Sequence, residues 1–302
     1  MALIEAIRKL TKERNAVILA HNYQLPEVQD IADYVGDSLG LSIQASKTDA
    51  DVIVFCGVYF MAETAKILSP GKTVLIPDEH AGCPMADMIN AEQLRALKKE
   101  HPRAKVLCYV NTTAEVKAEC DLCCTSANAV RMVKEVLKDE QEIIFAPDKH
   151  LSAYVASKTG REFITWQGYC PTHARILPED ILRERGLHPN AAVVVHPECR
   201  ADVIALADQV ASTEGMCRYV KETKSLEIIV GTEKGIIHRM EKENTEKKFY
   251  SVSPLAICGN MKLTSLEKIL WALEDMEYEV RVPEETARRA RKSIEGMLFA
   301  TT

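Results

Sequence analysis

Three cysteines recur along the chain at almost equal intervals. Cys83 and Cys170 are 87 residues apart, Cys170 and Cys258 are 88 apart, and no other pair of the ten cysteines has either separation. A long-range spacing that repeats is typical of an internal duplication. The spacing therefore predicts that the chain folds as three copies of one structural unit.

Polar residues repeat at the same offsets. The stretches AVILAHNYQLPEVQDIADYVGDS (16–38), KVLCYVNTTAEVKAECDLCCTS (105–126) and AVVVHPECRADVIALADQVAST (192–213) align. Three sets of polar positions coincide: His21, Tyr109 and His196; Tyr23, Asn111 and Glu198; Ser38, Ser126 and Thr213. A duplicated core would mainly preserve apolar positions. Because ligands bind at the carboxyl ends of strands in open α/β folds, these polar positions favour one shared central site.

The same units alternate strand and helix patterns. The β-branched runs DVIVFCG (51–57), EIIFAPD (142–148) and EIIVGTE (227–233) are each followed by a helical stretch and a further apolar run that ends at one of the three cysteines. Such alternation indicates βαβ units with parallel sheets. We predict an α/β protein of three pseudo-symmetric, three-layer αβα units around a central active site.

The predicted units follow from where the helical stretches end. We expect the helices in AEQLRALKKE (91–100) and LPEDILRERG (177–186) to close the first and second units. The predicted units are residues 1–102 with an N-terminal helix, 103–190, and 191–302 with a C-terminal helix.

Composition limits the class of protein and its partners. Hydrophobic residues make up 47% and charged residues 27%, and the net charge is −6 without a dense basic block, so nucleic-acid and membrane partners are not expected. The N-terminal MALIEAIRKLTKER is charged and unlike a signal peptide. We therefore expect a cytoplasmic protein, in which ten cysteines indicate buried thiols, a metal or catalysis rather than disulfides.

Three thiolates related by threefold symmetry suit an iron–sulfur cluster. A [4Fe–4S] cluster usually has four cysteine ligands, so three would leave one iron open to act as a Lewis acid. Two alternatives remain. Cys83, Cys170 and Cys258 with His173 would make a four-ligand zinc site, or all three thiols are simply buried.

The CDLCC segment, residues 120–124, contains a C-x-x-C pattern that often binds metal. It lies in an apolar run, and the aligned segments of the other two units lack these cysteines. We therefore predict that Cys120, Cys123 and Cys124 are core or near-surface thiols. Cys56, Cys108, Cys199 and Cys217 are predicted to be small core residues.

Ser38, Ser126 and Thr213 each precede a helical stretch. They could be ordinary helix N-caps. A helix start with a hydroxyl also binds carboxylate or phosphate, so three of them around one axis would suit a polyanionic substrate. Both roles can hold together.

Several motifs together resemble the quinolinate synthase family. These are LAHNYQLPEVQDIADYVGDSLGLS, TSANA, HPEC, GYCPTH, the GCP context of Cys83 and SPLAICGNMK, which together cover nearly the whole chain. The resemblance implies three αβα domains in a trimeric arrangement and one [4Fe–4S] cluster per chain, held by Cys83, Cys170 and Cys258. It also implies condensation of iminoaspartate with dihydroxyacetone phosphate to quinolinate, with release of phosphate and water.

The family pattern also places active-site residues on this chain. It implies catalytic roles for Tyr23, His173, His196 and Glu198, which offer general acids and bases of differing pKa. It implies substrate binding by His21, Ser38, Tyr109, Asn111, Ser126 and Thr213. An aspartate-oxidising partner enzyme is expected from the family.

One feature departs from the family pattern, and two other functions stay open. Some members carry a second cysteine soon after the third ligand, whereas Cys258-Gly259-Asn260-Met261 has none, which argues against a thiol switch there. A different open-iron lyase acting on a small di- or tricarboxylate is the first alternative function. A non-catalytic iron–sulfur or zinc sensor is the second, but the chain shows no helix-turn-helix or basic patch.

Overall fold

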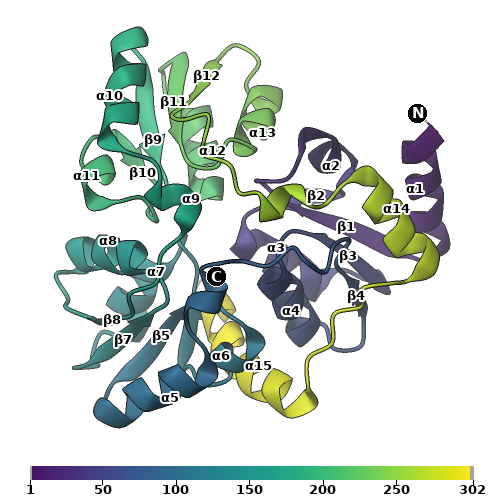
Figure 1. Cartoon of the computed structure of the whole chain (residues 1–302), viewed down its shortest axis with the longest axis horizontal. Helices are drawn as coiled ribbons and strands as arrows, with labels where there is room; N and C mark the ends of the chain where they lie inside the picture. Colours follow the sequence, from purple (N-terminus) through teal and green to yellow (C-terminus); the bar gives the residue numbers. More distant parts are fainter. Residues whose placement is uncertain (1, 300–302) are drawn as a thin grey trace.

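The computed structural model describes residues 2–299 and contains three four-stranded parallel sheets. The three sheets surround a common centre (Figure 1). In spatial order they are β2 (Tyr34–Gly36), β1 (Ala16–His21), β3 (Val52–Cys56) and β4 (Thr73–Leu75); β6 (Leu122–Cys124), β5 (Lys105–Tyr109), β7 (Ile143–Ala146) and β8 (Ile164–Thr165); and β10 (Gln209–Val210), β9 (Ala192–Val195), β11 (Glu227–Gly231) and β12 (Lys248–Ser251). The predicted fold class is confirmed. We call the sheets, with the helices packed on them, units 1, 2 and 3.

The strand register repeats with the sequence. Leu19 of β1 pairs with Tyr34, Leu107 of β5 pairs with Leu122, and Val194 of β9 pairs with Gln209. From unit 1 to unit 2 both residues of the pair move by 88 positions, and from unit 2 to unit 3 by 87. These are the offsets of the aligned polar positions. The duplication therefore extends to backbone pairing.

A partly buried contact supports this register in each unit. The carboxylates of Asp33, Asp121 and Asp208 accept hydrogen bonds of 2.8, 2.9 and 2.7 Å from the backbone of Ile18, Val106 and Val193. Each aspartate lies just before its edge strand and binds the first strand of the same unit. The contact satisfies a backbone N–H that the short edge strand cannot reach.

Helices cover both faces of the sheets. The β-branched strands β3, β7 and β11 are buried almost throughout, as expected for parallel strands between helical layers. The helices are α1 (Ala2–Glu13), α2 (Pro26–Ile31), α3 (Ser38–Lys47), α4 (Tyr59–Leu68), η1 (Ala86–Met88), α5 (Ala91–Glu100), α6 (Ala114–Lys117), α7 (Ala129–Arg131), η2 (Met132–Val136), α8 (Lys149–Thr159), α9 (Pro171–Ala174), α10 (Pro178–Leu187), α11 (Ala201–Ile204), α12 (Thr213–Glu222), α13 (Ile236–Glu243), η3 (Asn260–Lys262), α14 (Leu266–Asp275) and α15 (Glu284–Phe299).

Helices α5 and α10 do not close the preceding units as we predicted. Helix α5 packs on α6, and its Arg95 forms a 2.9 Å ion pair with Glu119, so it belongs to unit 2. Helix α10 packs on β11, and its Ile181 lies in the core of unit 3. Periodicity identifies a helix but not the sheet that its apolar face covers. The units thus begin near these helices, earlier than the predicted boundaries at 103 and 191.

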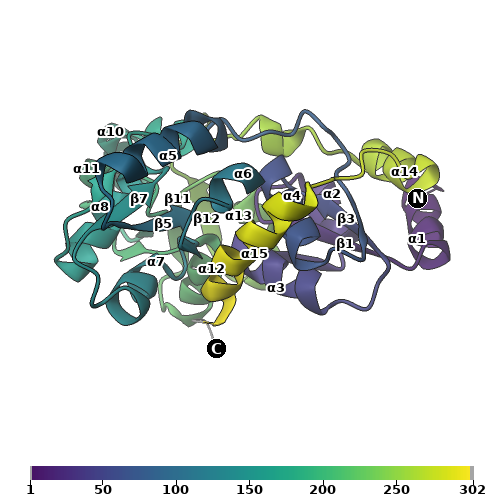
Figure 2. The ribbon, with the colours of Figure 1, turned by 90° about the horizontal axis from the view of Figure 1, so that it is seen from below.

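The C-terminal helices also pack outside unit 3, to which we assigned them. Helix α14 lies against α1, and the following segment pairs with β4 through Leu75 and Glu279. Helix α15 packs on α4, α6 and β6, and it crosses from unit 1 to unit 2 in Figure 2. The end of the chain therefore fastens units 1 and 2 together.

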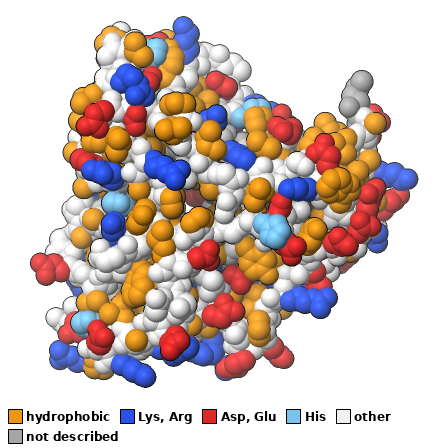
Figure 3. Space-filling view, viewed as in Figure 1, with side chains coloured by type: hydrophobic (Ala, Val, Ile, Leu, Met, Phe, Trp, Pro, Cys, Tyr) orange, Lys and Arg blue, Asp and Glu red, His pale blue; other side chains and the backbone are white. Residues whose placement is uncertain are grey.

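The surface carries both signs of charge. Acidic and basic side chains are interspersed on the face in Figure 3. Within residues 2–299, no helix combines the length and apolar character needed to cross a membrane.

Candidate active site

The three units meet at a cavity of about 690 Å³, including its open mouth. Loops that follow the strands carry most of its lining, as expected at the carboxyl ends of parallel strands. All the residues that the sequence singled out for binding or catalysis line it: His21, Tyr23, Ser38, Cys83, Tyr109, Asn111, Ser126, Cys170, His173, His196, Glu198, Thr213 and Cys258. The structure thus brings together residues that are far apart in sequence.

The loops after β1 and β9 hold their histidines in the same way. The backbone N–H of Tyr23 donates to His21 Nδ1 at 3.2 Å, and that of Glu198 donates to His196 Nδ1 at 3.3 Å. Each Nδ1 is thus an acceptor, so the neutral ring carries its proton on Nε2. His196 Nε2 lies 3.2 Å from Ser126 Oγ, to which it can donate across the boundary between units 2 and 3.

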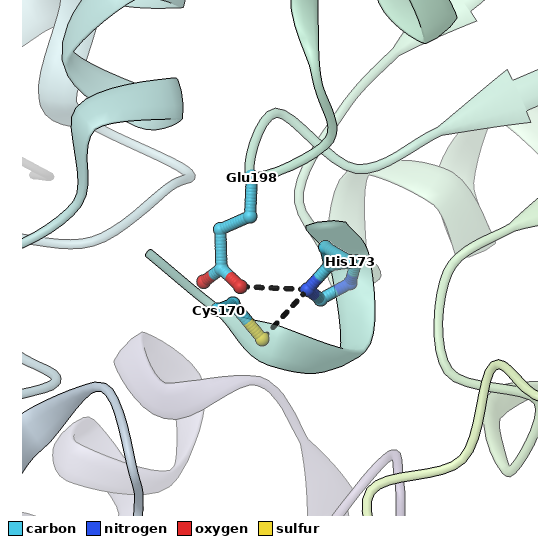
Figure 4. A group of neighbouring side chains, drawn as sticks. All are labelled: Cys170, His173 and Glu198. Carbon is cyan, nitrogen blue, oxygen red and sulfur yellow. Dashed lines mark hydrogen bonds and ion pairs between the residues drawn. The ribbon is translucent and has the colours of Figure 1, made fainter. Parts of the chain in front are cut away.

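His173 and Glu198 form the centre of the polar lining (Figure 4). His173 Nδ1 lies 2.7 Å from Glu198 Oε2 and 3.2 Å from Cys170 Sγ. Cys170 and His173 come from the start of α9, whereas Glu198 reaches them from the loop after β9. The His173 ring also stacks on His196 with ring centroids 4.7 Å apart. All three labelled side chains can therefore act on one bound group.

Hydrogen bonds continue from this pair to both tyrosines. His173 Nε2 lies 2.8 Å from Thr232 Oγ1, which also bonds the Tyr23 hydroxyl. On the other side, the Tyr109 hydroxyl donates to Glu198 Oε1. A buried hydrogen-bonded chain thus runs from Tyr23 through Thr232, His173 and Glu198 to Tyr109. Such a chain can move or hold a proton across the cavity.

Burial sets the charge states of the side chains around this hydrogen-bonded chain. It lowers the pKa of His21 and of His196 to about 3, so both rings are neutral near pH 7. Burial and the Glu198 carboxylate raise the pKa of Tyr23 and of Tyr109 well above the usual range. Burial alone would raise the pKa of Glu198, but His173, His196 and the Tyr109 hydroxyl lower it overall. Glu198 is thus an ionised carboxylate at the centre of the site.

The three cavity thiols are protonated when nothing is bound to them. Burial, with smaller contributions from Cys258 and Glu198, raises the pKa of Cys83 to about 12. Burial and the Glu198 charge raise the pKa of Cys170, and burial raises that of Cys258. Metal ligation requires thiolates, so a bound cation would have to release these protons.

The spacing of the donor atoms separates the metal hypotheses. Among the described residues, the ligating atoms that all lie within 4.8 Å of one another are those of Cys170, His173 and Glu198, a group that could hold a metal ion. Zinc–sulfur bonds of about 2.3 Å place two thiolates on one zinc no more than roughly 4.6 Å apart. Cys83 and Cys258 are not part of this compact group, so the four-ligand zinc site that we kept as an alternative is not preformed.

The hydroxyl residues are not the helix caps that we considered. Asp37, not Ser38, caps α3 by accepting from the backbone of Gly40, and Ser212, not Thr213, caps α12. Ser38 and Thr213 are instead the first residues of these helices, and Ser126 precedes the short α7 by three positions. The capping role falls to the preceding side chain, which leaves these hydroxyls on the cavity lining.

The other cysteines lie away from the cavity lining. Cys123 and Cys124 are fully buried in the core, and Cys120 donates to the Val116 carbonyl from a partly buried position. Cys56, Cys108, Cys199 and Cys217 are buried as predicted. The prediction that the CDLCC cysteines are core or near-surface thiols is confirmed.

Sequence reasoning missed several residues of the site. Thr232 and Glu233 end the EIIVGTE run, which we interpreted only as a strand with turn residues. Thr232 joins Tyr23 to His173, and Glu233 lines the cavity beside Cys258. Asn22, between two predicted site residues, donates to Thr213 Oγ1 at 2.9 Å. Their place at strand ends was the available signal.

Three parallel α/β units that share one cavity of thiols, imidazoles and a buried carboxylate define an α/β enzyme with a central, pseudo-threefold active site. The family model described as Quinolinate synthetase A protein matches residues 5–299. The chain therefore belongs to the quinolinate synthetase A family of enzymes.

Curated relatives match over almost the full length. The chain is 54% identical to Quinolinate synthase 1 of Methanosarcina acetivorans over 98% of this chain and 97% of the relative. It is 56% identical to Quinolinate synthase of Dehalococcoides mccartyi strain CBDB1, over 97% and 96% of the two chains. It is also 56% identical to Quinolinate synthase of Desulforudis audaxviator, over 98% and 97%. The resemblance found in the sequence motifs is confirmed.

Proposed function

We propose that this enzyme condenses iminoaspartate with dihydroxyacetone phosphate to form quinolinate, releasing phosphate and water. The observation that supports it most is the single cavity lined by three thiols together with the chain from Tyr23 to Tyr109. Forming a pyridine ring from these substrates requires repeated proton transfers and loss of hydroxyl groups. The cavity offers groups suited to both.

Cys83, Cys170 and Cys258 would hold one [4Fe–4S] cluster per chain. The three thiols line one cavity but do not gather at single-metal distances, which fits a cluster with three protein ligands. When bound, the cluster supplies an iron without a cysteine ligand that acts as a Lewis acid on substrate oxygen or nitrogen.

Glu198 and His173 would carry the central proton transfers. Glu198 remains ionised and accepts from Tyr109, while His173 Nδ1 lies 2.7 Å from its other oxygen. A proton taken up at Glu198 can therefore pass to or from His173 without large movement. Thr232 links His173 to the Tyr23 hydroxyl, which can donate to a departing substrate oxygen.

The neutral histidines and hydroxyls would orient the substrates. His196 Nε2 and Ser126 Oγ face one another at 3.2 Å, and both line the cavity, so they can bind one carboxylate or phosphate group. Ser38 and Thr213 lie at the N-terminal ends of ten-residue helices, where the helix dipole favours anions. Asn111 Oδ1 is buried without a protein partner, and its amide faces the same cavity.

The proposal is tested by assaying the anaerobic, cluster-loaded protein with both substrates. We expect quinolinate and inorganic phosphate to form in equal amounts. A fully loaded protein that makes neither would refute the proposed reaction. Formation of another product from a different di- or tricarboxylate would instead support the alternative lyase. Iminoaspartate would come from an aspartate-oxidising enzyme, and we propose that the reaction takes place in the cytoplasm.

A further inference from the structure

The segment that begins at the third cavity cysteine contacts the loops of Gly82, Tyr23 and Glu233. We call residues 258–262, Cys258-Gly259-Asn260-Met261-Lys262, the post-cysteine turn. Its last three residues form η3, and Lys262 N–H donates to the Gly259 carbonyl at 3.0 Å. Met261 lines the cavity, whereas Asn260 and Lys262 do not. The two polar side chains thus point to the loops around the cavity rather than into it.

Asn260 connects two of the cavity cysteines. Its Nδ2 donates to the Gly82 carbonyl at 2.7 Å, and Gly82 immediately precedes Cys83. Asn260 itself lies two residues after Cys258. One side-chain hydrogen bond therefore joins the loop of the first cysteine to the loop of the third.

Lys262 connects the third cysteine to Tyr23. Its ammonium group donates to the Tyr23 carbonyl and lies 2.9 Å from Glu233 Oε1. Glu233 in turn accepts from the Cys258 backbone N–H at 3.3 Å and from that of Gly235 at 2.7 Å. The Glu233 side chain is fully buried and that of Lys262 is 19% exposed, so this pair is held with little solvent. Removing one partner would leave the other charge buried and unpaired.

The close approach of the Lys262 ammonium group to the Tyr23 backbone depends on Gly235. A Cβ atom at this position would lie 2.6 Å from Lys262 Nζ and 2.9 Å from the Tyr23 carbonyl oxygen. To admit a Cβ atom, the Tyr23 backbone and the Lys262 side chain would both have to move. Gly235 therefore provides independent evidence that the lysine, the carboxylate and the Tyr23 backbone form one built junction.

We propose that the post-cysteine turn is a clamp, in which Asn260 and Lys262 are positioning residues. Asn260 sets the distance between the Cys83 and Cys258 loops, and Lys262 sets the place of Tyr23 relative to Cys258. The inference rests on the proposed function for the roles of the thiols and Tyr23. It assigns roles to Asn260 and Lys262 in the stretch after Cys258, where this chain lacks the second cysteine of the family pattern.

The first test measures how firmly the cluster is held. Asn260→Ala and Lys262→Met should each speed iron loss to a chelator by roughly 10–100-fold, because the loops of Cys83 and Cys258 would no longer be held, and lost support around a metal site lowers metal affinity by a similar factor. Asn244→Ala and Lys268→Met are matched controls. Asn244 donates to the Met240 carbonyl at 2.8 Å, and Lys268 binds Asp78 and the Leu263 carbonyl, all outside the cavity lining. The controls should release iron at the wild-type rate.

The second test separates positioning from general destabilisation. Lys262→Met should lower kcat by on the order of 10²-fold, because a displacement of about 1 Å near the chemistry has such an effect. KM should stay unchanged because Lys262 contacts no substrate-binding hydroxyl. Lys262→Arg, which keeps the charge, should restore most of the turnover. Gly235→Ala, which keeps all the charged groups, should reproduce the Lys262→Met loss.

Wild-type rates of iron loss and turnover in Asn260→Ala, Lys262→Met and Gly235→Ala would overturn the clamp. The iron-loss test needs no turnover, so it judges the clamp even if a loaded enzyme makes no quinolinate. If the wild type binds no cluster, the rate of Cys83 alkylation in the metal-free full chain is measured in place of the rate of iron loss. Alkylation that is faster in Asn260→Ala than in Asn244→Ala supports the clamp, and equal rates overturn it.

Discussion

Two groups of cysteines in this molecule have nearly the same number of thiols but different surroundings. Cys83, Cys170 and Cys258 come one from each unit and line a cavity that also contains Glu198 and three histidines. Cys108, Cys120, Cys123 and Cys124 all belong to unit 2, where Cys108 pairs with Cys123 across neighbouring strands. The first group lies between the units and the second lies within one.

The surroundings decide what each group can do. The unit 2 thiols are packed among apolar residues, and burial together with neighbouring thiols raises their pKa, so they are inert core residues. Burial also raises the pKa of the cavity thiols. The cavity beside them has room for a cation, and its ionised carboxylate attracts one; a bound cation would lower the pKa of the thiols again. Neither the number of cysteines nor a C-x-x-C pattern separates the two groups, whereas symmetry-related positions around an open cavity do.

The largest difference between the two groups should appear when their cysteines are removed. Cys83→Ala, Cys170→Ala or Cys258→Ala should each abolish the cluster and reduce turnover below detection. Cys123→Ala and Cys124→Ala should keep both and lower the free energy of unfolding by about 1 kcal/mol through lost packing. Visible absorbance of the anaerobic proteins and denaturant titration measure the two effects. Cluster loss in Cys123→Ala, at normal stability, would mean that the two groups were confused.

The next prediction concerns Tyr23 and Glu198, the acid–base side chains that lie near the cavity cysteines and not near the unit 2 cysteines. Tyr23→Phe and Glu198→Gln should keep the full cluster but lower turnover by on the order of 10²–10⁴-fold, the contribution of a positioned proton donor or acceptor. Steady-state kinetics at matched iron content measures this. Near-normal turnover in both variants would show that these side chains only line the cavity.

The buried histidines should make the metal-free cavity sensitive to acid. The pKa of His21 and of His196 is about 3 in the folded protein, compared with about 6.5 when unfolded. Between these values the unfolded chain binds more protons, so stability is complete above about pH 6.5 and falls as the pH decreases towards 3. Each histidine should contribute a slope on the order of 1 kcal/mol per pH unit. Urea titration of wild type and His196→Gln between pH 7 and pH 5 tests this, because the loss of stability should begin below about pH 6.5. Equal slopes for the two proteins would contradict the buried, neutral state of His196.

The smallest effect is expected for a single anion contact. Ser126→Ala removes a hydroxyl that pairs with His196 Nε2 at 3.2 Å and faces the cavity. The loss of one hydrogen bond of about 1 kcal/mol should raise KM roughly fivefold with kcat little changed. Initial-rate measurements over a range of both substrate concentrations separate the two constants. A fall in kcat at constant KM would instead give Ser126 a part in proton transfer.

The sequence predicted the repeated parts of the molecule better than the contacts between them. The spacing of Cys83, Cys170 and Cys258 was enough to predict three similar units, because strand register follows the same offsets. The sheet covered by α5 or α10 could not be predicted, since an amphipathic helix fits either neighbour. Thr232 and Lys262 were missed for a related reason. Their roles depend on contacts with Tyr23, more than 200 residues away, that no local pattern encodes.

The central claim is that symmetry makes one metal centre from three of the ten thiols. Iron, zinc and acid-labile sulfide should be measured in the wild-type protein after anaerobic purification, beside Cys170→Ala and Cys123→Ala. The account predicts about four irons and about four sulfides per chain in the wild type and in Cys123→Ala, and neither in Cys170→Ala. Stoichiometric zinc without sulfide in the wild type would contradict it.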